Sequence, residues 1–128
     1  MDRKVILTPK APAPIGPYSQ AIEANGLIFC SGQIPLDPTT GVLVTGDIAV
    51  QTRRILDNLE AVLAAAGTNL HKCLKLTVYL VDLKDFEGLN RVLAERYENM
   101  PPPARSVVQV SALPKGARVE MDLIASKS

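Results

Sequence analysis

Two charged residues in strand-like segments have side chains suited to chemistry on a small anion. Arg105 follows the proline triplet at 101–103, and a guanidinium at the start of a strand can bind a carboxylate through two parallel hydrogen bonds. Glu120 lies between Val119 and Met121, where partial desolvation can raise the pKa of a carboxylate that serves as a general base or acid. The simpler alternatives, a surface arginine and a cross-strand ion pair, stay open at this point.

Four further residues could border a ligand. Ser31 and Gly32 follow the apolar run at residues 27–30, and could offer a hydroxyl and a backbone N–H to an anion or merely end a strand. Asn90 lies beside the apolar stripe of a predicted helix, where its amide either satisfies a buried backbone group or reaches a ligand. Tyr18 ends a proline-rich segment, and its ring is either a packing anchor or a lid.

The composition excludes several classes of site and partner. The 128 residues include one histidine and two cysteines, too few to fill a four-ligand structural zinc site. Every Ser-His-Asp or Cys-His arrangement would have to use His71, which lies in a polar loop segment. Lys and Arg number 14 against 13 Asp and Glu, so no strong nucleic-acid or anionic-membrane footprint is expected. The function must be sought in carboxylates, arginines, amides and backbone groups.

The apolar runs are too short for a signal peptide or a membrane span. The longest, at residues 61–66 and 27–30, fall far below the roughly 20 residues that a span requires. We therefore expect a cytoplasmic protein in which Cys30 and Cys73 are reduced and buried as small hydrophobes. No linker or repeat divides the chain, so residues 1–128 are expected to form one domain.

The sequence predicts two helices and six strands that position these candidates. Apolar residues repeat at helical spacing over residues 48–66 and 84–99, with Asp47 and Asp82 as N-caps and Gly67 after the first helix. Two amphipathic helices can cover only one face of a sheet, which indicates an α+β fold. Apolar runs and alternation predict strands at residues 5–7, 19–24, 27–33, 73–82, 105–111 and 118–125.

Alternation also assigns side chains to the two faces of the sheet. We expect the helix-covered face to carry Leu74, Leu76, Val78 and Leu80. The other face is too polar for a core and too apolar to face water, so we expect it to pack on another copy of the chain. The residues placed on that mixed face are Tyr79, Val81, Arg105, Val107, Gln109, Glu120 and Ile124.

A register count separates the two charged candidates. If the last two strands form a hairpin around residues 113–116, residue 109 lies opposite Glu120, and Arg105 lies roughly 13 Å further along the strand. The two side chains could then meet across a subunit boundary, or another strand could intervene and change the geometry. We favour the subunit boundary, because the mixed face already requires a partner.

Taken in order, these segments resemble the RidA/YjgF family of imine and enamine deaminases. The resemblance covers nearly the whole chain and rests on several independent motifs. They are residues 13–20 (APIGPYSQ), 31–35 (SGQIP), the helix at 51–67, 75–82, Asn90, 103–106 (PARS), 113–116 (LPKG) and 119–121 (VEM).

The resemblance implies a chorismate-mutase-like, RidA-like fold in which two helices cover one face of a mixed six-stranded sheet. It implies a homotrimer with its pockets between subunits. The implied reaction is hydrolysis of reactive intermediates such as 2-aminoacrylate/2-iminopropanoate and 2-iminobutanoate to 2-oxoacids and ammonia. No metal and no organic cofactor are implied, and neither a membrane nor a nucleic acid is an expected partner.

The resemblance also implies roles for individual residues. Arg105 would hold the substrate carboxylate, and Glu120 would activate the attacking water and help protonate the leaving ammonia. Many family members have cysteine where this chain has Val107, so any thiol chemistry at that position is lost and the preferred side chain of the imine is not fixed. The other pocket residues carried over are Tyr18, Ser31, Gly32 and Asn90.

Two other functions compete with the deaminase. A regulatory module would keep the carboxylate pocket and act through a protein partner without turnover, although it would not need Glu120 as a base. An RNA-directed activity, suggested by relatives described as translation inhibitors, gains little support from a net charge of +1 and five aromatic residues.

Overall fold

The computed structural model describes residues 2–128 and confirms the predicted succession of elements. Most boundaries move by a few residues from those expected. Short 3-10 turns precede β4, α2 and β6. The elements are β1 (Lys4–Ile6), β2 (Ala21–Ala24), β3 (Leu27–Gln33), α1 (Ile48–Ala65), β4 (Cys73–Leu80), α2 (Phe86–Arg96), β5 (Ala104–Gln109) and β6 (Val119–Ser126).

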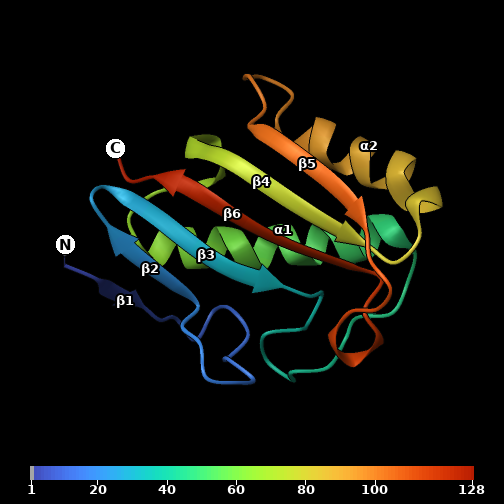
Figure 1. Ribbon diagram of the computed structural model, residues 1–128, viewed down its shortest axis with the longest axis horizontal. Coiled ribbons are helices and arrows are strands. Elements are labelled where there is room, and N and C mark those ends of the chain that lie inside the picture. The colour runs from blue at the N-terminus through green and yellow to red at the C-terminus, as the bar shows by residue number, and fades with distance from the viewer. Residues whose placement is uncertain (1) are drawn as a thin grey trace.

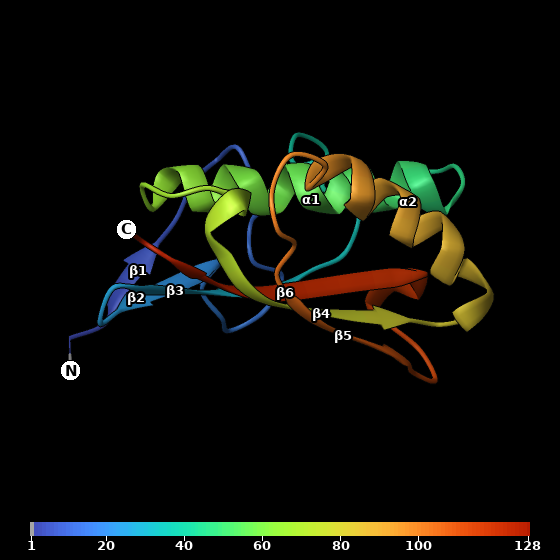
Figure 2. The same ribbon diagram turned by 90° about the horizontal axis from the view of Figure 1, so that it is seen from above.

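The six strands form one mixed sheet in the order β1-β2-β3-β6-β4-β5 (Figure 1). Strand β4 pairs parallel with β5 and antiparallel with β6, and the other neighbouring strands are antiparallel. Both helices lie on one face of the sheet, and no helix of the described chain covers the other face (Figure 2). The predicted α+β fold is therefore confirmed.

The last two strands do not form the hairpin that we considered. Strand β4 lies between them, so Tyr79 is level with Glu120 on one side and with Val108 on the other. The reason is the β4–α2–β5 unit, whose helix returns the chain to pair parallel with β4. The intervening strand is the second of the two geometries left open by the register count.

Strand β5 also presents the opposite face from the one expected. Arg105 is level with Leu76, and Val107 is level with Val78, whose side chains are buried beneath the helices. The alternation was predicted correctly, but placing Arg105, Val107 and Gln109 on the uncovered face was wrong. Side chains of β5 alternate between two faces, and each of the two alternating sets contains both polar and apolar residues. The sequence pattern of β5 therefore does not show which set faces the core.

The other residues of the mixed face fall into two groups. Tyr79, Glu120 and Ile124 lie on the uncovered face, as expected. On β6, Glu120 and Ile124 alternate with buried residues, and Tyr79 pairs with Glu120 and so shares its face. Val81 lies beyond the end of β4, where its N–H donates to the Arg118 carbonyl at 3.1 Å. The uncovered face therefore carries fewer of the polar candidates than the sequence suggested.

One residue of β4 also departs from its predicted face. Leu74 is 50% exposed, whereas Cys73 is buried. The pairing with β6 shifts between Cys73 and Lys75, and such a bulge reverses the alternation at its own position. Leu76, Val78 and Leu80 are buried as predicted.

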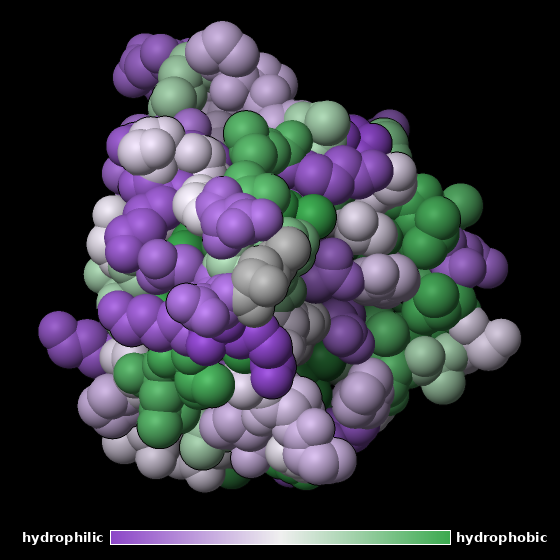
Figure 3. Space-filling model, turned by 60° about the vertical axis from the view of Figure 1, so that its left-hand side comes forward, coloured by the Kyte–Doolittle hydropathy of each residue, from purple (hydrophilic) through white to green (hydrophobic). Residues whose placement is uncertain are grey.

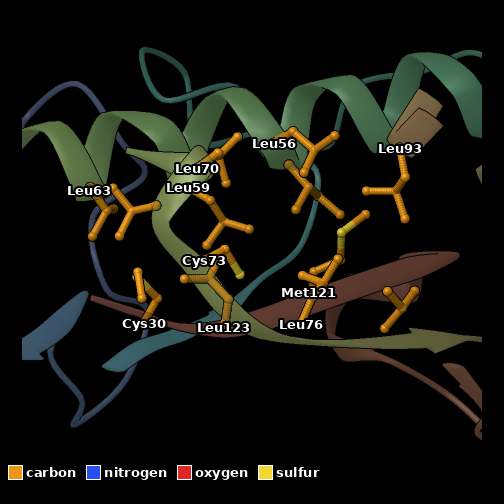
Figure 4. Close-up of a cluster of buried hydrophobic side chains, with 14 of the residues drawn as sticks. Cys30, Leu56, Leu59, Leu63, Leu70, Cys73, Leu76, Leu93, Met121 and Leu123 are labelled. Atoms are coloured by element: carbon orange, nitrogen blue, oxygen red, sulfur yellow. The ribbon is translucent and has the colours of Figure 1, made fainter. Parts of the chain in front are cut away.

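The core fills the space between the helices and the covered face of the sheet (Figure 4). Cys30 and Cys73 lie in it as free thiols, and burial raises the pKa of Cys30 to about 12 and that of Cys73 to about 11. The prediction that both are small buried hydrophobes is confirmed. Helix α1 contributes the largest group of fully buried side chains: Ile55, Leu56, Leu59, Val62 and Leu63.

The helix ends agree only in part with the predicted caps. The Asp47 side chain accepts a hydrogen bond from Val50 N at 3.0 Å, and Gly67 follows α1 with a φ of 84°. Asp82 instead caps the 3-10 turn Leu83–Asp85 that precedes α2. Between residues 2 and 128, no helix is long and apolar enough to cross a membrane, and no cluster of His, Cys, Asp and Glu forms a metal site.

Candidate functional site

Four of the predicted site residues line one small cavity of about 270 Å³. Ser31 and Gly32 lie near the end of β3, where its pairing with β6 shifts between Cys30 and Gln33. Glu120 is the second residue of β6, and Tyr18 comes from the proline-rich segment. The complete lining is Ile15, Tyr18, Ser31, Gly32, Ile34, Pro114 and Glu120.

Gly32 is needed for the position of Glu120. A Cβ atom at residue 32 would overlap the carboxylate of Glu120 and lie 3.0 Å from its Cδ. The φ of Gly32 lies outside the left-handed region, so the requirement here is space and not backbone conformation. Any side chain at this position would displace the acid from the cavity.

Ser31 fastens the segment that carries Tyr18. Its hydroxyl donates to the Ser19 carbonyl at 2.6 Å, and its N–H donates to the Gln20 carbonyl at 3.0 Å. The hydroxyl and the N–H of Ser31 itself are therefore both engaged with backbone. The Tyr18 hydroxyl accepts from Ile15 N at 3.2 Å, and the ring is 44% exposed at the wall of the cavity.

Gln20 is a structural residue of this region that the sequence did not reveal. It is 1% exposed, and its amide oxygen accepts from Thr8 N at 2.7 Å. Its amide nitrogen donates to the carbonyls of Thr8 at 3.1 Å and Pro12 at 2.9 Å. One side chain therefore ties the proline-rich segment to the start of β2. A lone glutamine beside a strand gives no sequence signal for such a role.

The Glu120 carboxylate is free to bind a water molecule. Among residues 2–128, no group donates a hydrogen bond to it, and the Tyr79 hydroxyl opposite donates to Asp122 at 2.9 Å instead. Burial raises the pKa of Glu120, and the nearby Asp122 raises it further. A half-buried carboxylate with this proton affinity can act as a base and can also return the proton.

Arg105 and Asn90 lie together at a second place, away from the cavity that Ser31, Gly32 and Tyr18 line. The guanidinium donates to Asn90 Oδ1 at 2.5 Å, and its central carbon lies 5.5 Å from the centre of the Phe86 ring. Phe86 and Asn90 are one turn apart on α2, so this helix holds the arginine from two sides. In the sequence, Phe86 belongs to the apolar stripe of the helix predicted over residues 84–99, which indicates only a packing role, and its spacing of one turn from Asn90 was the available signal.

A groove of about 730 Å³ adjoins Arg105. It lies between α2 and the segment that leads into β5, and its walls are mainly apolar. Val107, the remaining predicted pocket residue, lines neither cavity and packs partly buried against the core. The lining is Leu76, Asn90, Leu93, Ala94, Tyr97, Glu98, Pro102, Pro103 and Arg105.

Arg105 and Glu120 do not meet within one chain. Strand β4 separates them, and Arg105 is three residues from Val108, the β5 residue level with Glu120. That places their Cα atoms roughly 10 Å apart across the strands and roughly 10 Å apart along them. The side chains of Arg105 and Glu120 also project from opposite faces of the sheet. Within one copy, Arg105 and Glu120 therefore line two separate cavities.

Comparisons with known proteins agree with this fold. The family model that matches is endoribonuclease L-PSP, over residues 8–127. A RutC family protein of Pyrococcus abyssi is 52% identical over 127 residues, which span 99% of each chain. The 2-iminobutanoate/2-iminopropanoate deaminase of Mus musculus is 46% identical over 123 residues, which span 96% of this chain and 90% of the mouse protein.

A solved structure is similar over almost the same length. The crystal structure of E. coli TdcF with bound serine matches with a TM-score of 0.93 at 39% identity, covering 98% of this chain and 99% of that one. Sequence and structure thus agree over nearly every residue, from the proline-rich segment to the last strand. The chain belongs to the endoribonuclease L-PSP family, the family of the RidA/YjgF proteins.

Proposed function

We propose that the protein hydrolyses small 2-iminoacids, such as 2-iminopropanoate and 2-iminobutanoate, to 2-oxoacids and ammonia. The observation that carries this proposal is the Glu120 carboxylate, which lies in a cavity over Gly32, accepts no hydrogen bond from the described residues and has a raised pKa. The name of the mouse relative supports the same reaction.

Arg105 binds the substrate carboxylate in this proposal. A guanidinium can donate two parallel hydrogen bonds to a carboxylate, and the contacts with Asn90 and Phe86 hold it in place before the substrate arrives. The serine bound by the E. coli relative is a small amino acid with such a carboxylate. Binding through this group leaves the neighbouring C=N bond exposed to water.

Glu120 handles the protons. It takes a proton from water as the oxygen bonds to the carbon of the protonated imine, and the C=N π electrons move to nitrogen. The protonated Glu120 then gives its proton to the amine of the carbinolamine. The C–N bond breaks, ammonia leaves, and the hydroxyl loses its proton to Glu120 as the C=O bond forms. Water is the sole co-reactant.

The uncovered face of the sheet supports assembly into a homotrimer. Val5, Ile22, Phe29 and Ile124 are register partners in one row across four strands of this face. Val5 is 58% exposed and Phe29 is 41% exposed. Such a row favours contact with other copies. Figure 3 brings the β1 side forward and shows apolar side chains among polar ones. Sites between subunits would join Arg105 of one copy to Glu120 of the next.

A coupled assay tests the reaction. A threonine or serine dehydratase generates the enamine, and semicarbazide traps the imine that survives. We expect the protein to suppress the trapped product and to accelerate 2-oxoacid formation.

Arg105→Ala and Glu120→Ala should each reduce this acceleration by at least about 100-fold because each removes a principal catalytic interaction. Arg53→Ala is the control, since Arg53 lies on α1 and pairs with Glu95. Wild-type turnover by folded Arg105→Ala would contradict the proposal.

Ligand sensing without turnover is the second candidate, and the serine held by the E. coli relative favours it. It predicts that small carboxylates bind and that Arg105→Ala abolishes their binding, while the imine survives at the uncatalysed rate. Calorimetric titration with serine, run beside the coupled assay, separates the two functions.

A further inference from the structure

A hydrogen-bonded pair lies beside the proposed base on the uncovered face. The Tyr79 hydroxyl donates to Asp122 Oδ2 at 2.9 Å. Across the β4–β6 pair, however, Tyr79 is level with Glu120, and Asp122 is level with Thr77. The tyrosine therefore reaches diagonally to the next acid along β6 and leaves the acid opposite without its hydrogen bond.

Glu120 and Asp122 form a pair of like charges. They are two residues apart on β6, so their side chains share one face and their Cα atoms are roughly 7 Å apart. A neighbouring negative charge disfavours ionisation of a carboxylate. Asp122 accordingly raises the pKa of Glu120, in addition to the larger effect of burial.

Two cations on these strands have partners other than Glu120. On β4, Lys75 Nζ lies 3.1 Å from Ser106 Oγ. At the start of β6, Arg118 is held at 2.8 Å by Asp85.

The other residues that line the cavity with Glu120 carry no charge. Strand β3 contributes Ser31 and Gly32, and the proline-rich segment contributes Tyr18 and Ile15. Pro114 completes the wall next to β6. Within the described residues of one copy, Asp122 is therefore the charged group that acts on Glu120.

We propose that Tyr79 and Asp122 are positioning residues that hold a fixed negative charge beside Glu120 on the uncovered face. The Tyr79 hydroxyl fixes the Asp122 carboxylate through their hydrogen bond, and the negative charge of Asp122 makes Glu120 a stronger base. The pKa of Tyr79 is raised, chiefly because its hydroxyl donates to Asp122, so its proton stays in this bond. The inference rests on the proposed function only where it makes Glu120 a catalytic base, because the pKa of Glu120 can be measured without turnover.

The test is an NMR titration of the assembled protein labelled with ¹³C at the glutamate carboxyl groups. The Glu120 signal is assigned by its loss in Glu120→Gln. We expect Asp122→Asn to lower the titration midpoint of Glu120 by roughly half to one pH unit, since it removes a like charge at this distance. Tyr79→Phe should cause a smaller shift in the same direction, because the Asp122 carboxylate then loses the hydroxyl that holds it beside Glu120. Asp57→Asn is the control, since Asp57 pairs with Arg96 in the helix layer.

An unchanged Glu120 midpoint in folded Asp122→Asn would overturn the inference. If that variant does not fold, Asp122→Thr removes the same charge from a strand position. Where turnover is observed, the acidic limb of kcat/KM should move to lower pH by the same amount. Absence of turnover with the NMR shift intact would contradict the proposed function and leave the electrostatic pair in place, whereas turnover with no shift would contradict the pair alone.

Discussion

The carboxylate of Glu120 lies over residue 32 because that residue has no side chain. The atoms that a new Cβ would meet belong to the outer part of the Glu120 side chain and not to backbone. A flexible side chain can swing aside at little cost, so the fold tolerates the change while the acid leaves its place. We therefore expect a substitution of Gly32 to lower the activity while it leaves the stability of the fold almost unchanged.

We expect Gly32→Ala to reduce deaminase activity by at least about tenfold and to change the free energy of unfolding by less than about 1 kcal/mol. The coupled assay and chemical denaturation measure the two effects. In a Glu120→Ala background, Gly32→Ala should cost no further activity, because both changes remove the same group. Full activity in the single variant would show that Glu120 works from another position.

The site residues differ in how far sequence could reveal them. Arg105, Glu120 and Asn90 could be named in advance because a guanidinium, a carboxylate and an amide each limit the chemistry available. Phe86 and Gln20 could not, because an aromatic ring in an apolar stripe and a polar residue beside a strand have ordinary structural uses. Their roles depend on contacts between segments that only the fold brings together.

At the scale of elements, the proline-rich segment keeps its shape through the buried amide of Gln20. Gln20→Leu would leave the N–H of Thr8 and two carbonyls without partners inside the protein. We expect a loss of about 2–4 kcal/mol in the free energy of unfolding. Ser31→Ala, which removes a single bond to Ser19, should cost about 1 kcal/mol. Chemical denaturation compares them, and equal losses would contradict the role given to Gln20.

The strands of the sheet could be located from the sequence, but their pairing could not. Alternation located β4, β5 and β6 correctly, because side chains on neighbouring positions point to opposite faces. Alternation did not show that Arg105 lies on the helix-covered face. That placement depends on the pairing of β5 with β4, which follows from the crossover through α2. Alternation also missed the bulge at Leu74, which depends on pairing with a strand far along the chain.

At the scale of the whole molecule, the proposed trimer with sites between its subunits would make two inactive variants complementary. Arg105→Ala retains Glu120, and Glu120→Ala retains Arg105. When the two variants are unfolded together and refolded, every mixed trimer contains one junction with both residues intact. Random mixing should therefore restore about a quarter of wild-type activity.

Each variant refolded alone should stay inactive, and sedimentation should show that both assemble. A mixture that forms trimers and stays inactive would place the two residues in separate sites. The double variant Arg105→Ala/Glu120→Ala, mixed with either single variant, should restore nothing, since no junction then holds both groups.

The walls of the two cavities contain no lysine, cysteine or histidine. Both thiols lie in the core, where burial raises the pKa of Cys30 to about 12 and that of Cys73 to about 11. An imine carbon electrophilic enough to react with water also reacts with amines and thiolates. The lining residues offer it carboxylate, guanidinium, amide and hydroxyl groups, so water is the nucleophile at hand. If the proposed reaction is the function, a protein built this way would process reactive electrophiles without accumulating covalent adducts on its own side chains.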